Sequence, residues 1–174
     1  MKYRAALAIL GFAFSLSAAA AVETTRDGFF STRSVILVEA RPAVAWKALS
    51  QVSKWWEPAH TWSGSARNLV LEARAGGCFC EKLEDGGSVQ HARVVFAQPG
   101  QTLRLDGALG PLQEMPVTGV LTFTLAPDAS GTRITMTYQV AGALSMDAAK
   151  LAPLVDQVMS AQLERLREFI KPSP

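Results

Sequence analysis

The fold is decided by the last third of the chain, where residues 117–140 read VTGVLTFTLAPDASGTRITMTYQV and residues 147–170 read DAAKLAPLVDQVMSAQLERLREFI. In the first stretch, apolar and polar residues alternate on both sides of a turn, which is typical of two half-buried antiparallel strands. In the second stretch, apolar residues recur every three or four positions, which predicts a long amphipathic helix. A sheet and a helix that each have one apolar face must bury these faces against each other, so we expect a two-layer α+β domain.

The preceding residues add strands and two short helices to this core. Residues 34–39 predict a first strand, Pro42 fits the first turn of a helix, and a second short helix is expected to carry Trp55 and Trp56. Extended runs then follow at residues 69–71, 78–81, 89–97 and 103–105, and Asp85-Gly86 predicts a tight hairpin turn between two of them. We expect about six or seven antiparallel strands, and this order excludes a doubly wound parallel sheet. Because of Pro153, regular helix is expected to begin nearer Ala152.

The N-terminus has the pattern of a secretory signal peptide. Lys2 and Arg4 precede an apolar run that ends in four alanines, and the run is shorter than the roughly 20 residues that span a bilayer. We expect cleavage after Ala20 or Ala21, with a retained anchor as the alternative, and therefore a periplasmic or secreted protein. The single domain then covers residues 22–174.

The charge balance argues against nucleic acid as a partner. Removing residues 1–21 leaves 153 residues with 15 bases against 15 acids, and no run of like charge follows. Nucleic-acid binding requires a basic face, which such a chain lacks. A domain of this size buries enough surface to fold without a metal or a disulfide, so any metal would be functional and not structural. We assign no cofactor.

Four short motifs carry a resemblance to a known superfamily. They are Ala40-Arg41-Pro42-Ala43-Val44-Ala45-Trp46, Gly76-Gly77-Cys78-Phe79, Pro99-Gly100 and Gly131-Thr132-Arg133-Ile134-Thr135. Together with the order of elements, they resemble the START-like, or SRPBCC, superfamily over nearly all of residues 22–174. The double glycine followed by an aromatic is most similar to the branch of homologues of the activator of the heat-shock ATPase.

The resemblance implies a helix-grip fold, in which a curved antiparallel sheet surrounds the C-terminal helix with an apolar cavity between them. The superfamily uses that cavity for lipids, steroids, polyketides and other hydrophobic molecules, and sometimes for cyclisation or hydrolysis. We expect a binding protein for a small hydrophobic or amphipathic ligand. The alternatives are a polyketide cyclase-like or hydrolase-like enzyme and an ATPase-activating accessory module, against which export argues.

Three tryptophans lie close together in an irregular segment. Trp55, Trp56 and Trp62 surround Pro58 and His60. One interpretation is that these rings plug the end of the core, because each buries a large area. The other is that they line the mouth of a ligand cavity. The candidate ligand-binding residues are Trp55, Trp56, His60, Trp62, Phe79, Glu81, Val94, Phe123, Met136, Tyr138 and Met159.

Two cysteines, Cys78 and Cys80, leave the same face of an expected strand. An exported protein favours a disulfide, but residues two apart in an extended strand stand about 6.5 Å apart, farther than a bridge prefers. If Asp85-Gly86 forms a two-residue turn, Cys80 pairs with His91, and the thiolates and imidazole could bind zinc or copper with His60. Half-buried thiols or a strained bridge are the interpretations that we favour over a metal.

The register of the superfamily implies a different assignment of faces. It places Phe79, Glu81, Ala92 and Val94 on the concave side with Leu121, Phe123, Ile134, Met136 and Tyr138. Cys78, Cys80 and His91 then face outward. No hydrolase, kinase or dehydrogenase motif occurs in the chain, so we assign no catalytic residue.

Overall fold

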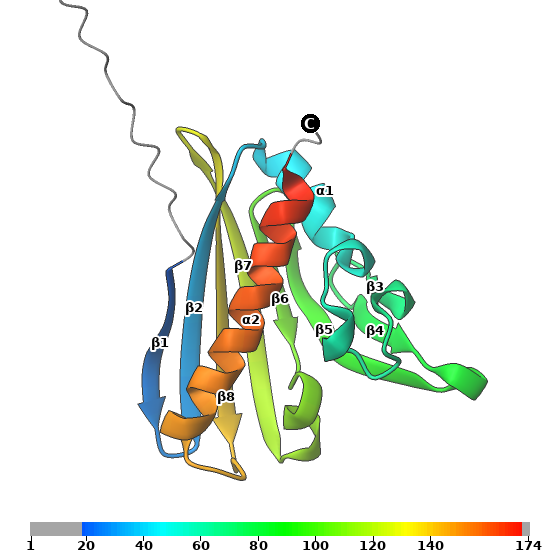
Figure 1. The fold of residues 1–174 in the computed structure, drawn as a ribbon, viewed down its shortest axis with the longest axis vertical. Coiled ribbons are helices and arrows are strands. Elements are labelled where there is room, and N and C mark those ends of the chain that lie inside the picture. Colours follow the sequence, from blue (N-terminus) through cyan, green and yellow to red (C-terminus); the bar gives the residue numbers. More distant parts are fainter. Residues whose placement is uncertain (1–18, 172–174) are drawn as a thin grey trace, which may run out of the picture.

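The chain forms one antiparallel sheet with a long helix lying across its concave face (Figure 1). The computed structural model describes residues 19–171, and the strand order is β1-β2-β8-β7-β6-β5-β4-β3. The strands are β1 (Ala19–Arg26), β2 (Phe29–Val38), β3 (Leu69–Leu71), β4 (Cys78–Lys82), β5 (Ser88–Gln98), β6 (Thr102–Asp106), β7 (Val117–Asp128) and β8 (Gly131–Gly142). The helices are α1 (Pro42–Ser50) and α2 (Ala148–Ile170). Short 3-10 turns lie between the other elements, namely η1 (Val52–Lys54), η2 (Pro58–His60), η3 (Ala66–Asn68), η4 (Glu84–Gly86) and η5 (Gly110–Glu114). The predicted helix-grip architecture is confirmed.

The β7–β8 hairpin follows the predicted alternation. The strands pair without a break from Val117 opposite Gly142 to Asp128 opposite Gly131. Leu121, Phe123 and Met136 are buried on the face toward the helices. Because side chains alternate between the two faces of a strand, this register also fixes which residues can reach a ligand.

Helix α2 begins earlier than the sequence predicted. It starts at Ala148, because the Asp147 side chain accepts a hydrogen bond from the Ala149 amide at 2.8 Å and so caps the first turn. Pro153 lies inside the helix and is exposed. Our expectation of a start nearer Ala152 was therefore wrong, since the cap stabilises the turn that the proline would otherwise weaken.

The N-terminal part of the sheet also extends beyond the prediction. Strand β1 was not predicted, and β2 begins at Phe29 instead of residue 34, so the sheet has eight strands instead of six or seven. Strand β1 is an edge strand whose side chains from Val22 to Arg26 are mostly exposed, which explains why no apolar alternation marks it. The expected signal peptide lies outside the described residues, except that 19–21 begin β1.

The two helices cover different parts of the sheet. Helix α2 lies closest to β1 and β2 and is joined to β2 by a hydrogen bond of 2.8 Å between the hydroxyls of Ser34 and Ser160. The segment from α1 to Trp56 covers the inner side of the strands from β3 to β7. No helix among residues 19–171 is both long enough and apolar enough to cross a membrane.

Candidate functional site

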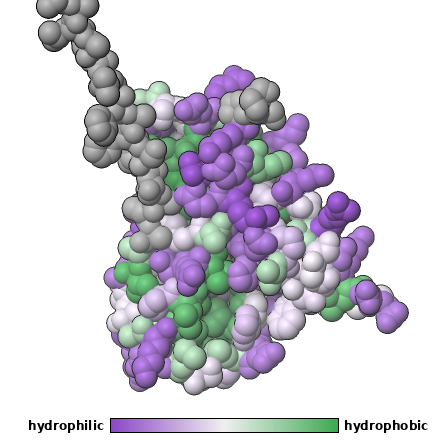
Figure 2. Space-filling model, viewed as in Figure 1, coloured by the Kyte–Doolittle hydropathy of each residue, from purple (hydrophilic) through white to green (hydrophobic). Residues whose placement is uncertain are grey.

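The concave face of the sheet gathers most of the predicted ligand-binding residues in one apolar core. The members of this core are Trp55, Trp56, Phe79, Val94, Phe123, Met136, Tyr138 and Met159. Each is at most 7% exposed. Figure 2 shows apolar residues gathered in a hollow on this face, beside the N-terminal half of α2. The apolar composition of this face favours contacts with apolar groups, because burying them removes apolar surface from water.

A small void remains inside this core. It is lined entirely by apolar side chains, namely Leu49, Val52, Trp55, Trp56, Leu71, Phe79, Leu105, Leu121 and Phe123. Its volume is about 10 Å³, which is close to the space that one water molecule needs. The void lies under the segment from α1 to Trp56 and not under α2, so the interior is nearly filled where the tryptophans enter it.

Trp55 and Trp56 close this end of the core. The Trp55 indole donates to the carbonyl oxygens of Ala48 and Leu49 at 3.1 and 3.3 Å, and the Trp56 indole donates to the carbonyl oxygen of His60 at 3.0 Å. The two rings lie 5.5 Å apart, and Trp56 meets Phe79 edge-on at 5.3 Å. For these two residues the geometry is that of a plug, because each ring is buried with its N–H satisfied.

Trp62 and His60 lie apart from the plug. Trp62 is 48% exposed and His60 is exposed on η2, so neither side chain reaches the apolar core. They remain available at the surface of the loop that follows Trp56. The three tryptophans therefore divide into two that fill the core and one that faces solvent.

Helix α2 fastens the start of this loop. The Glu57 amide donates to Oε1 of Gln162 at 2.8 Å, and Arg165 donates through Nε to the Trp55 carbonyl oxygen at 2.8 Å. Arg165 also forms an ion pair with Glu57 at 2.8 Å. Gln162 is fully buried, and its Nε2 has no hydrogen-bond partner among the described residues. Sequence reasoning missed Gln162, whose position on the apolar stripe of α2 was the available signal.

Glu81 fastens the same loop from the sheet side. Its carboxylate accepts hydrogen bonds from the amides of Trp62, at 3.1 Å, and Ser63. It is also 2.9 Å from Nε2 of His91. Glu81 is 1% exposed and His91 is 6% exposed. A carboxylate buried to this degree is stable only because all its partners are present.

The electrostatics of this pair follow from burial and hydrogen bonding. Burial alone would raise the pKa of Glu81, but the hydrogen bonds from Ser63, Trp62 and His91 outweigh it and hold that pKa below its usual value. Burial lowers the pKa of His91 and outweighs the opposing effect of Glu81. At neutral pH, Glu81 is therefore an anion held by neutral donors.

Tyr138 supplies another buried polar group on the concave face. Its hydroxyl accepts a hydrogen bond from the Leu109 amide at 2.9 Å and donates one to the Gly107 carbonyl oxygen at 3.2 Å. Burial raises the pKa of Tyr138, so the phenol stays neutral. It holds the segment before η5 against β8 and leaves its ring in the apolar core.

The inward position of His91 contradicts both sequence-based assignments. Phe79 pairs with Ala92, but Cys80 pairs with Gln90, so His91 is an extra residue at a β-bulge. The bulge turns His91 inward, next to the Phe79 ring at 5.0 Å. The predicted pairing of Cys80 with His91 was wrong, and so was the outward position of His91. The predicted inward positions of Phe79, Glu81, Ala92 and Val94 are confirmed.

Cys78 and Cys80 form a disulfide on the other side of β4, where both are half-buried. Their Cα atoms are 5.4 Å apart, within the range that a bridge accepts. Our geometric argument against a bridge was wrong, because β4 is contracted here and not fully extended. The side chains considered as metal ligands, Cys78, Cys80, His91 and His60, do not form one site. Residues 19–171 contain no cluster of three or more His, Cys, Asp or Glu suited to a metal.

The double glycine before β4 has a structural role. Gly76 has a φ of +77°, and a side chain on Gly77 would collide with the carbonyl oxygens of Glu72 and Arg74. The turn is also hydrogen-bonded to β5, because the Gly76 amide donates to the Val94 carbonyl oxygen at 2.8 Å. Glycine is therefore required where the chain enters the strand that carries Phe79 and Glu81.

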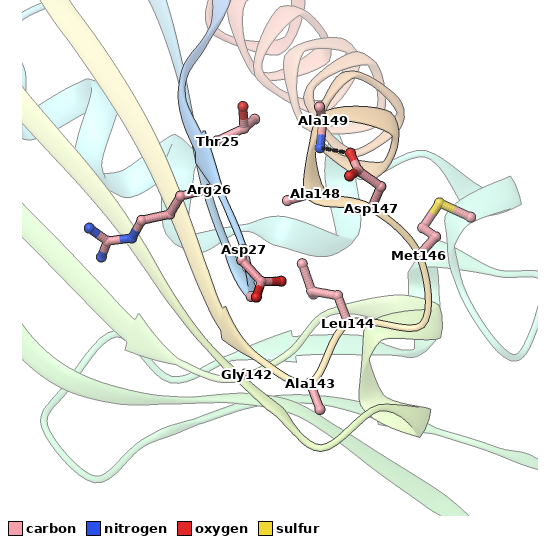
Figure 3. Close-up of a pocket in the computed structure, with 11 residues that line it drawn as sticks. Thr25, Arg26, Asp27, Gly142, Ala143, Leu144, Met146, Asp147, Ala148 and Ala149 are labelled. Atoms are coloured by element: carbon pink, nitrogen blue, oxygen red, sulfur yellow. Dashed lines mark hydrogen bonds between the residues drawn. The ribbon is translucent and has the colours of Figure 1, made fainter.

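A larger, open pocket of about 1040 Å³ lies at the opposite end of α2. Its walls come from the β1–β2 turn, the end of β8 and the first turn of α2 (Figure 3). Asp27 points into the pocket, Arg26 points away from it, and the Asp147 carboxylate is engaged as the helix cap. The pocket contains no predicted site residue, and its carboxylates disfavour anionic ligands.

A family model matches most of the chain. It is described as "Polyketide cyclase / dehydrase and lipid transport" and matches residues 30–170. This range begins within β2 and ends at the last residue of α2, so it contains the whole site. Among curated proteins, none matches this chain.

Solved structures share the fold at low sequence identity. A protein from Rhizobium leguminosarum is 19% identical with a TM-score of 0.61, and the match covers 87% of this chain and 97% of that one. MLL2253 from Mesorhizobium loti is 19% identical with a TM-score of 0.58, covering 80% and 95%. CalU16 from Micromonospora echinospora is 17% identical with a TM-score of 0.58, covering 91% and 86%.

Proposed function

The chain belongs to the polyketide cyclase/dehydrase and lipid transport family, and from this premise we propose that it binds one small hydrophobic or amphipathic molecule on the concave face of its sheet. The observation that carries the proposal is the apolar hollow beside α2 (Figure 2), on a face whose buried side chains are almost all apolar. Burying an apolar ligand there gains about 25 cal/mol for each Å² removed from water.

Ligand entry requires the plug to move. Small-molecule sites usually measure about 300–1,000 Å³, far more than the void of about 10 Å³ under Trp55 and Trp56. The segment that must yield is the loop after Trp56, which is fastened by Gln162 and Arg165 on one side and by Glu81 on the other. A ligand that extends from the hollow beside α2 into this part of the core therefore has to displace Trp55 and Trp56.

The test is capture of a ligand from a mixture. Purified protein is incubated with an organic-solvent extract of membranes, re-isolated, and analysed by native mass spectrometry. A bound organic molecule of defined mass supports the proposal. Absence of any co-purifying molecule, with the protein folded, contradicts it.

Trp62→Ala separates a ligand contact from a structural role. Trp62 is 48% exposed, so its loss should change the free energy of unfolding by less than about 0.5 kcal/mol. Uptake of a hydrophobic fluorescent probe should fall more than the melting temperature does. Val70→Ala, at 46% exposure, is the matched control and should change neither. Equal loss of probe uptake and stability in Trp62→Ala would assign Trp62 to the plug.

Export is part of the proposal. It is supported by the signal-like residues 1–21 and by the Cys78–Cys80 bridge, which is the cysteine state of oxidising compartments. Cleavage after Ala20 or Ala21 leaves Val22–Arg26 of β1 with their partners on β2. Fractionation of expressing cells with N-terminal sequencing tests this, and an intact cytosolic chain would overturn it. That result would instead favour the ATPase-activator branch.

A second candidate function, cyclase-like or hydrolase-like catalysis, is favoured by the Glu81–His91 pair. A carboxylate and an imidazole at hydrogen-bond distance in an apolar interior form an acid–base arrangement. Once a bound ligand is identified, its conversion can be followed in wild type and in His91→Gln. Turnover lost with binding retained would establish catalysis. Binding without turnover in the wild type would exclude it.

A further inference from the structure

The β4–β5 hairpin contains two registers. Asp85 and Gly86 have φ values of +55° and +78°, and the Gly87 amide donates to the Glu84 carbonyl oxygen at 3.0 Å. This predicted two-residue turn belongs to the same register as the pair Phe79–Ala92. Between them, the strands are shifted by one residue. The shifted pairs are Cys80–Gln90, Glu81–Val89 and Lys82–Ser88.

The shift is what places His91 inside. Without it, Cys80 would pair with His91, and the turn and the pair Phe79–Ala92 would stay as they are. Since side chains alternate along a strand, His91 would then lie on the outer face with the cysteines. The hairpin therefore has an alternative pairing with no bulge, and the two pairings differ in which face His91 occupies.

The disulfide lies where the register changes. The change occurs between Phe79 and Cys80, and the bridge joins Cys78 to Cys80 around that point. Their Cα separation of 5.4 Å is shorter than the roughly 6.5 Å of a regular strand. A shortened β4 leaves surplus length in β5, and a bulge at His91 takes up that surplus.

We propose that the Cys78–Cys80 bridge is a redox switch for this hairpin: closed, it holds His91 inside against Glu81, and opened, it lets the strands slip so that His91 turns to solvent. Opening requires an external dithiol, which donates two electrons and two protons. The S–S bond breaks, each sulfur becomes a thiol, and the dithiol closes to its own disulfide. The switch does not depend on whether the protein binds a ligand.

The structure also indicates how the change would spread. His91 is one of three donors to the Glu81 carboxylate, and that carboxylate holds the amides of Trp62 and Ser63. Phe79, between the two cysteines, contacts the rings of Trp56 and His91. Opening the bridge therefore weakens the fastening of the loop from the sheet side and leaves the contacts to α2 in place.

The experiment uses the two histidines of the chain, His60 and His91. Diethyl pyrocarbonate modifies accessible imidazoles, and peptide mapping by mass spectrometry measures the rate at each site. With the bridge closed, His91 should react at least about tenfold more slowly than the exposed His60. After reduction with dithiothreitol, checked by a gain of two daltons, the two rates should agree within about threefold.

Two variants complete the test. Cys78→Ser/Cys80→Ser imitates the open state without thiols and should react like the reduced wild type. Arg93→Ser changes an exposed residue opposite Cys78, leaves the bridge intact, and should react like the oxidised wild type. His91 staying as slow in the reduced protein and in the double variant as in the oxidised protein would overturn the proposal. Loss of the far-ultraviolet circular dichroism in the reduced protein and in the double variant would also overturn it, because the bridge would then be needed for the fold itself.

Discussion

The two halves of the sheet are built differently. In the half under α2, β2 pairs with β8 and β7 with β8 over their whole lengths, and the one register shift lies in the edge strand β1. In the half under the tryptophans, both β4–β5 and β5–β6 contain shifts, and the disulfide and the buried Glu81–His91 pair lie there. Long ladders stabilise the first half, whereas the second combines bulges with buried polar groups.

This difference indicates where the molecule can change shape. A continuous ladder has one good register, because a slip by one residue would expose its entire apolar face. A bulged hairpin can adopt a second pairing through a shift of one residue. Bulges are more common next to active sites, and so, independently, are residues with displaced pKa values. Substitutions in the first half should therefore affect stability alone, and substitutions in the second should also affect the loop.

The largest expected effect is in the half under α2. Leu163→Ala removes a side chain that is 1% exposed, and should lower the free energy of unfolding by about 3 kcal/mol through lost burial and a cavity. Urea denaturation measures this. Leu154→Ala makes the same change on α2 at a residue that is 56% exposed, and should cost less than about 0.5 kcal/mol. Similar losses in both would mean that α2 does not pack as described.

Glu81→Gln comes next and tests the other half. The amide keeps the size of the side chain but loses the charge that the Trp62 and Ser63 amides bind, so we expect a loss of about 2–3 kcal/mol. Trp62 fluorescence should shift as the loop loosens. Glu72→Gln, which removes an exposed ion pair with Arg74, should change stability by less than about 0.5 kcal/mol. If the Glu81→Gln protein were as stable as wild type, the Glu81 carboxylate would not fasten the loop.

Acid should weaken the same half. The folded protein holds the pKa of His91 below its usual 6.5, so the unfolded chain takes up this proton more readily and stability falls as the pH drops below about 6.5. The slope is at most about 1.4 kcal/mol per pH unit. Below about pH 4.5, protonation of Glu81 adds to the loss, because its pKa is also lowered in the folded state. Urea midpoints between pH 7 and 5 measure the His91 contribution, which His91→Gln should abolish and His60→Gln should leave unchanged.

The smallest expected effect concerns the contact between β2 and α2. Ser34→Ala removes the hydrogen bond to Ser160 and should cost about 1 kcal/mol, with no change in the reactivity of His91. In a double-mutant cycle, adding Ser160→Ala should cost little more, since the bond is already lost. Fully additive losses would show that the two hydroxyls do not interact.

Sequence patterns predicted the regular half better than the irregular one. The alternation in β7 and β8, the apolar stripe of α2 and the Asp85-Gly86 turn each follow from local rules. The inward turn of His91 does not, because a bulge shifts the register by one residue without altering the composition. The bridge was misjudged for the same reason, since the argument assumed a fully extended β4.

The site was predicted in part. Apolar residues on β4, β5, β7 and β8 gather as expected, because strand alternation specifies their face. Sequence spacing could not separate Trp62 from Trp55 and Trp56, since no periodicity operates within the loop. Gln162 and Arg165 act on residues more than a hundred positions away, and only tertiary structure reveals that.

The strand order has a consequence for how the chain is made. Strand β2 has β8 as its neighbour on the inner side of the sheet, and about ninety residues separate them. During synthesis, β2 therefore cannot pair with β8 until residue 142 has left the ribosome. Helix α2 is synthesised after that. Such non-local pairing slows folding and prolongs the time in which the nascent chain is open to chaperones or to a translocation channel.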